Sequence, residues 1–216
     1  MTDLVGGYIL FPPGLKRSDL ITLTLQAMEL APGEFEVRLP EDGLPRLPED
    51  GYPFRTEKPV ERALALLAQE ESGVIEGKGE KEFETYWFEP AIALAPVVNI
   101  WVSDSAMFYD TQAKRVEDFA RRWPHLCEQG QAVFGYFSPF EHMFDRDYLA
   151  QRIVPALERG DLVELMATDC NWLIYLGPEL AQRWRQEQTP FPSPPLLSLD
   201  LPSGAHFFRM RTEVFA

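Results

Sequence analysis

The amino-acid sequence predicts a single α+β domain at 1–216, with a mostly antiparallel sheet and three to five helices packed on it. Its length of 216 residues is enough for one large core, and 45% of the residues are hydrophobic, as in ordinary globular proteins. Short strand-like segments joined by polar turns alternate with segments whose apolar residues recur at helical spacing.

The clearest architectural signal lies between Val163 and Trp184. Asn171 to Leu176 is typical of a buried strand, which Gly177 should end. Pro178 suits the first helical position, where a missing N–H costs nothing, and Glu179 places a carboxylate beside the positive end of the helix. We expect this stretch to support the fold, and it contains no catalytic signature.

The front of the chain predicts two strands around one helix. Gly6 to Phe11 and Glu34 to Leu39 are typical of strands. The intervening run DLITLTLQAMEL also fits an alternating strand, but Ser18 as a cap and Pro32-Gly33 as a stop favour a helix.

The middle of the chain alternates helices with strands. Val97 to Val102 is apolar on both faces, which indicates a central strand. Two strands joined by a polar GKGEK turn precede it, and two helices flank this group, the second stopped by Pro124. The predicted ranges are helices Pro59–Glu71 and Gln112–Trp123, and strands Val74–Glu76 and Phe83–Phe88.

The back of the chain predicts a strand at Ala132–Phe137 and a helix at Asp147–Leu157 that Pro155 kinks or ends. Leu162–Ala167 fits either a strand or a short helix. After a Pro-rich linker at 188–195, the final residues form a hairpin that turns at Ser203-Gly204 and returns to the main sheet.

The charge balance narrows the class of partner. With 20 basic and 34 acidic residues, the net charge of −14 argues against binding to nucleic acid or to an anionic membrane. The span 29–89 alone holds 16 acidic and 7 basic residues, so the acidity is concentrated toward the front. This pattern fits either solubility or an acidic face for a basic partner. No run of the sequence is long and apolar enough to cross a bilayer. We expect a cytoplasmic protein that is a monomer or a small homo-oligomer.

A tandem octapeptide stands out near the front. RLPEDGLP at Arg38–Pro45 is followed at once by RLPEDGYP at Arg46–Pro53. Two prolines in each unit prevent a regular helix or a central strand, so an acidic Pro-rich loop is expected at 38–53. The loop is either a tolerated expansion or a binding element that displays four carboxylates, those of Glu41, Asp42, Glu49 and Asp50.

Catalytic signatures are weak throughout. The two cysteines, Cys127 and Cys170, are far apart and outside any CxxC spacing, so reduced thiols in or near the core are expected, with neither a disulfide framework nor a zinc site. No cofactor is expected. His125 lies two residues from Cys127, a spacing that seldom lets two side chains face each other. The sequence contains neither a GxSxG nucleophile elbow nor a Gly-rich phosphate loop. A non-catalytic protein is therefore expected.

One cluster supports an alternative enzyme hypothesis. Glu141, His142, Asp145 and Asp147 in FEHMFDRDY could gather around a divalent cation, or could form a solvated loop with Asp145 or Asp147 as a helix cap. The overlapping run FSPFEHMF places aromatics, among them Phe140 and Phe144, in a proline-containing loop that could anchor a partner or lie buried.

Three segments then resemble a known family. GYFSP (Gly135–Pro139), NWLIYLGPEL (Asn171–Leu180) and LPSGAHFFRM (Leu201–Met210), behind an acidic front, resemble immunity proteins of bacterial type VI secretion and polymorphic toxin systems. The resemblance implies a cytosolic, non-catalytic protein that binds a cognate toxin and occludes its active site. An acidic regulatory or scaffolding domain remains the other non-enzymatic reading. The candidate contacts are Glu41, Asp42, Glu49, Asp50, Phe140, Glu141, His142, Phe144 and Asp145.

Overall fold

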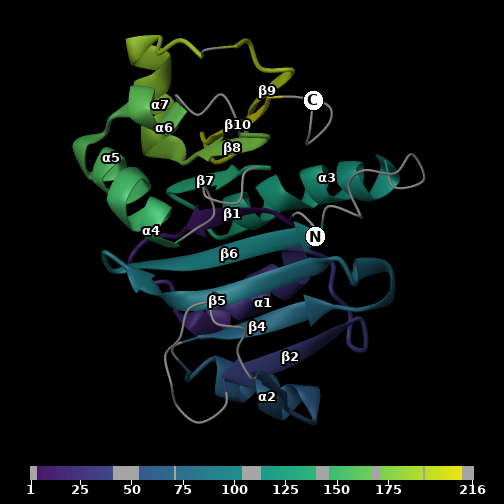
Figure 1. Ribbon diagram of the computed structural model, residues 1–216. Helices are drawn as coiled ribbons and strands as arrows, with labels where there is room; N and C mark the ends of the chain where they lie inside the picture. The colour runs from purple at the N-terminus through teal and green to yellow at the C-terminus, as the bar shows by residue number, and fades with distance from the viewer. Residues whose placement is uncertain are drawn as a thin grey trace.

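One antiparallel sheet runs through the molecule in the computed structural model, which describes residues 4–40, 54–70, 72–103, 113–139, 146–166, 171–191 and 193–210. Its ten strands follow the order β3-β2-β4-β5-β6-β1-β7-β8-β10-β9 (Figure 1). The strands are β1 Leu4–Leu10, β2 Phe35–Pro40, β3 Phe54–Thr56, β4 Gly73–Gly77, β5 Glu84–Ile92, β6 Ala95–Ser103, β7 Phe134–Phe137, β8 Leu173–Leu176, β9 Leu197–Asp200 and β10 His206–Arg209. The predicted α+β class with an antiparallel sheet is confirmed.

The helices cover the two faces of this sheet unequally. The α1–α3 set packs on one face along most of its width, and the α4–α7 set packs on the other face over β1, β7, β8 and β10 (Figure 1). The helices are α1 Arg17–Ala27, α2 Val60–Leu67, α3 Ala113–Gln129, α4 Arg146–Tyr148, α5 Val154–Arg159, α6 Leu162–Met166 and α7 Pro178–Glu187. Successive residues of a strand point to opposite faces of the sheet, so the core has two parts, one beneath each set of helices.

The stretch that carried the clearest sequence signal folds as predicted. Strand β8 ends at Leu176, Gly177 is the N-terminal cap residue, and α7 begins at Pro178 with Glu179 in its first turn. The predicted C-terminal hairpin is also present, since the N–H of Leu201 donates to the carbonyl of Ala205 at 3.0 Å. Strand β10 then pairs with β8, which returns the hairpin to the main sheet.

The alternatives left open by the sequence are resolved toward helix. The run 17–27 forms α1, and Leu162–Met166 forms α6. Ser18 is not the cap of α1, because the helix begins one residue earlier, at Arg17, with Lys16 at the cap position. Pro155 does not end its helix. It lies in the first turn of α5. A π-helical turn at 149–153 directly precedes this position and accommodates the loss of the backbone hydrogen bond that proline cannot make.

The prediction that Pro124 stops the third helix is wrong. Helix α3 continues to Gln129 with Pro124 inside it. Proline removes one backbone hydrogen bond, but Leu126 and Cys127 beyond it are fully buried, and their burial outweighs the lost bond. Tertiary packing has overridden the local signal at this position.

A buried ion pair fixes α3 against the sheet and α1. The guanidinium of Arg122, only 1% exposed, donates to both carboxylate oxygens of Glu84 at 2.5 and 3.1 Å. It also donates to the carbonyl of Met28 at 2.7 Å, while the Tyr86 hydroxyl donates to Glu84. Burial raises the pKa of Tyr86 well above its ordinary value, so this hydroxyl keeps its proton. These bonds offset much of the cost of burying the charge pair, and Nε of Arg122 is left without a partner within the described residues.

No helix within the described ranges is long and apolar enough to cross a membrane.

We expect Arg122→Ala to lower the free energy of unfolding by roughly 3–5 kcal/mol, because it leaves the Glu84 carboxylate buried without its partner. The neighbouring Arg121 offers a matched control, since its ion pair with Glu29 has both side chains 53% exposed and should contribute less than about 1 kcal/mol. Urea denaturation of both variants measures the difference. Equal losses for Arg121→Ala and Arg122→Ala would contradict the assigned role of the buried pair.

Candidate protein-binding surface

None of the nine candidate contacts lies within the described residues. Those outside are Glu41, Asp42, Glu49, Asp50, Phe140, Glu141, His142, Phe144 and Asp145. Their roles therefore stay predictions. Of the hypothetical metal cluster only Asp147 is described, in α4, and the described residues contain no group of three or more metal-ligating side chains.

Cys127 and His125 do not form a reactive pair, as their spacing predicted. Cys127 is buried with a free thiol, and burial raises its pKa well above the ordinary value, so the nucleophilic thiolate is disfavoured. His125, by contrast, is exposed on α3. The sequence-based expectation of a reduced thiol in the core is confirmed for Cys127, and Cys170 lies outside the described ranges.

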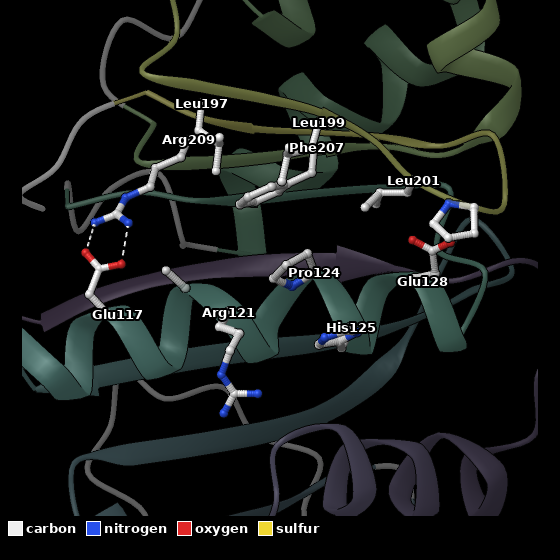
Figure 2. A pocket seen from close by; sticks show the side chains of 12 residues that line it. Glu117, Arg121, Pro124, His125, Glu128, Leu197, Leu199, Leu201, Phe207 and Arg209 are labelled. Atoms are coloured by element: carbon white, nitrogen blue, oxygen red, sulfur yellow. Dashed lines mark hydrogen bonds and ion pairs between the residues drawn. The ribbon is translucent and has the colours of Figure 1, made fainter.

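A groove of about 650 Å³ separates α3 from the C-terminal hairpin. Figure 2 shows Leu199 and Phe207 of the hairpin above Pro124 of the helix. The lining is mainly apolar, and polar and charged side chains surround it. The apolar lining residues are Ala120, Pro124, Leu197, Leu199, Leu201, Pro202 and Phe207, and the rim residues are Glu117, Arg121, His125, Glu128 and Arg209.

Polar contacts close the two ends of the groove. At one end, Arg209 donates to both oxygens of Glu117 at 2.7 and 2.8 Å (Figure 2). The Arg209 guanidinium also lies 5.7 Å from the centre of the Trp172 ring. The hydrogen bonds from Arg209 lower the pKa of Glu117, so the carboxylate stays charged. At the other end, Glu128 accepts the backbone N–H of Ser203 at 2.8 Å. These clamps hold α3 and the hairpin at a fixed separation.

The outer wall of the groove is the edge strand β9, and its apolar side chains reach solvent. Leu197 is 38% exposed and Leu199 is 42% exposed. Strand β9 is the last strand of the sheet and pairs with β10 on its inner side. An edge strand with exposed leucines is a ready site for association, and soluble proteins usually protect such edges.

The opposite face of β9 carries a polar cross-link between the strands. The hydroxyl of Ser198 and Nε2 of His206 are 2.7 Å apart, and Nδ1 of His206 is 2.9 Å from Oδ1 of Asp200. Arg185 of α7 also donates to Oδ1 of Asp200 at 2.5 Å. No sequence motif pointed to this set. Alternation along β9, combined with the correctly predicted turn at Ser203-Gly204, could have placed Ser198, Asp200 and His206 on one face.

The order of hydroxyl, imidazole and carboxylate matches that of a nucleophilic triad, but its surroundings favour a structural role. The groove lies on the leucine face of β9, whereas Ser198 points to the opposite face. The Asp200 side chain is 73% exposed and shares one of its carboxylate oxygens with Arg185 and His206. His206 packs against Trp184 and Phe208, with ring centres 4.8 and 4.4 Å away. We therefore interpret the set as a clamp that joins β9 to β10 and α7.

We expect His206 to make stability depend on pH. Burial lowers its pKa despite the opposing effect of Asp200, so the folded value lies below the unfolded value of about 6.5. The contribution of the neutral imidazole is complete above about pH 6.5 and is lost as the pH falls through the folded pKa. Urea unfolding at about pH 8 and about pH 5.5 should show a smaller gap between the wild type and His206→Gln at the lower pH. A gap that widens at the lower pH would contradict this assignment.

Comparisons with known proteins concern the fold. No protein-family model and no curated protein matches this chain. A solved structure described as Pseudomonas aeruginosa T6SS protein PA0821 is similar, with a TM-score of 0.50 and 16% sequence identity. The match covers 95% of this chain and 65% of that chain, so this chain spans about 65% of that protein's length. At 16% identity the likeness shows only that the two chains share a fold. The similar structure, not this chain, is the one described as a T6SS protein.

Proposed function

We propose that this protein is a non-catalytic immunity protein that binds and neutralises a cognate secreted bacterial toxin. The observation that carries the proposal is the groove between α3 and β9, with its clamped ends and solvent-exposed leucines. An apolar depression with a charged rim has the layout of a protein-contact site, where a desolvated centre is surrounded by polar groups.

The segments that resemble immunity proteins lie at the same surface, which supports its role as the binding site. Its three segments are distant in sequence, but they contribute β7, β8 and β10, which are consecutive strands of the sheet. Strand β10 provides Phe207 and Arg209 to the groove. The likeness in fold to a Pseudomonas aeruginosa T6SS protein is consistent with this context.

The charges have a separate role in the proposal. A net charge of −14 attracts a basic partner over a distance and raises the rate of encounter. Affinity then comes from apolar burial. Covering the remaining exposed surface of Leu197 and Leu199 contributes on the order of 1 kcal/mol for each side chain. Neutralisation follows if the bound protein covers the active site of the toxin.

We expect the double variant Leu197→Glu/Leu199→Glu to lose protection against the toxin, because two carboxylates in the contact would have to be desolvated. The assay expresses a candidate toxin domain from a gene neighbouring that of this chain and scores growth with and without the protein. Leu94→Glu is the matched control. Leu94 is 82% exposed in the β5–β6 turn, outside the groove lining, so this variant should protect fully.

Circular dichroism and thermal unfolding first establish that both variants are folded. Full protection by the folded double variant would place the contact elsewhere on the molecule. If the wild-type protein itself gave no protection against the encoded toxin domain, the immunity function would be wrong.

A further inference from the structure

We propose that β9 accepts an extended segment of the toxin as an additional strand, with apolar side chains over the groove and basic side chains beside Asp200. This inference rests on the proposed function and specifies how the partner is held. It extends the sheet beyond its last strand by main-chain pairing.

The hydrogen-bond alternation determines which backbone groups of β9 face outward. Leu201 donates to Ala205, so this pair is hydrogen-bonded, and the register then makes Leu199↔Phe207 the next hydrogen-bonded pair. The intervening residues Ser198 and Asp200 occupy non-hydrogen-bonded positions. Their backbone N–H and C=O groups therefore point away from β10, and both residues are exposed. This is the pattern of main-chain groups that an added antiparallel strand needs.

The two edges of the sheet differ in how they are protected. The opposite edge, β3, is only three residues long and carries Arg55, whose side chain is 52% exposed. A short, charged edge resists pairing with other chains. Strand β9 instead presents Leu197 and Leu199, and prolines bracket it at Pro195 and Pro202. Because proline has no backbone N–H to donate to a neighbouring strand, an added strand can pair with β9 only along 196–201.

The side chains on the two faces of β9 select the chemistry of the added strand. Residues that lie over Leu197 and Leu199 would contact the apolar lining of the groove. Residues on the other face would lie beside the Asp200 carboxylate. Arg185 and His206 both bind its Oδ1, and within the described part of the chain Oδ2 accepts no hydrogen bond. A lysine or arginine suits this position, and the net charge of −14 disfavours an acidic segment.

A synthetic hexapeptide can test strand addition directly. The probe is acetyl-Lys-Val-Lys-Val-Lys-Val-amide, titrated into the full-length protein and followed by the amide NMR signals of β9. We expect the signals of Ser198 and Asp200 to shift. The alternating Glu-Val peptide should bind at least tenfold more weakly, because its carboxylates would approach Asp200.

Backbone methylation distinguishes main-chain pairing from simple apolar contact. Peptide residues opposite Ser198 and Asp200 exchange hydrogen bonds with them, so N-methylation of the lysines should abolish binding. N-methylation of the valines places the methyl groups on the outer edge and should preserve it. On the protein side, Ser198→Pro removes the outward N–H and should abolish binding, whereas Ser198→Ala removes only the hydroxyl and should preserve it.

The possible outcomes separate this inference from the proposed function. Absence of shifts at β9 with the Lys-Val peptide, or equal binding of the two methylated peptides, would overturn strand addition. Toxin protection that survives in Ser198→Pro would also overturn it, while leaving the immunity function intact. If the protein forms a dimer that Ser198→Pro dissociates, the edge is occupied by a second copy and the inference is wrong. Peptide binding at β9 without toxin protection would remove the proposed function instead.

Discussion

The fold depends on the placement of β1 in the middle of the sheet. This N-terminal strand pairs with β6 over seven residues, Leu4 to Leu10, but pairs with β7 only at Ile9 and Leu10. An isolated bridge between Gly6 and Ser138 continues the contact. A side chain at Gly7 would place its Cβ 1.9 Å from the carbonyl oxygen of Tyr136, so the close approach of β1 and β7 requires glycine there. This seam joins the two parts of the sheet and so places β9 at the far edge.

Helix α3 packs against the sheet with one face and lines the groove with another. The inner face buries Trp123 and Leu126 and holds the ion pair of Arg122. The face toward the hairpin presents Ala120 and Pro124 to the groove. A second buried carboxylate, Glu89, accepts hydrogen bonds from Tyr8, Asn99 and Arg146 and so ties α4 to the centre of the sheet. Internal charges thus fix the helices, while the apolar edge at β9 is left exposed to solvent.

Local patterns in the sequence predicted most of the elements, and long-range pairing accounts for what they could not predict. Strand β8 with α7, the hairpin turn at Ser203-Gly204 and the central position of β6 all follow from periodicity and turn chemistry. The groove does not, because Glu117 and Arg209 meet across 92 positions of sequence. The continuation of α3 through Pro124 also escaped prediction, since it depends on tertiary burial beyond the proline. The loop predicted at 38–53 starts too early, because residues 38–40 end the inner strand β2 and pair there with β3. The rest of that loop and most of the FSPFEHMF run lie outside the described residues, and the site that emerged comes from residues assigned to scaffold.

Amide hydrogen exchange measured residue by residue in the toxin complex shows whether a partner strand extends the sheet at β9. In the free protein the outward N–H groups of Ser198 and Asp200 should exchange rapidly, and that of Leu199, bonded to β10, should exchange slowly. We expect the complex to slow exchange at Ser198 and Asp200 and to leave Leu199 slow in both states. Unchanged rapid exchange at Ser198 and Asp200 in a saturated complex would contradict it.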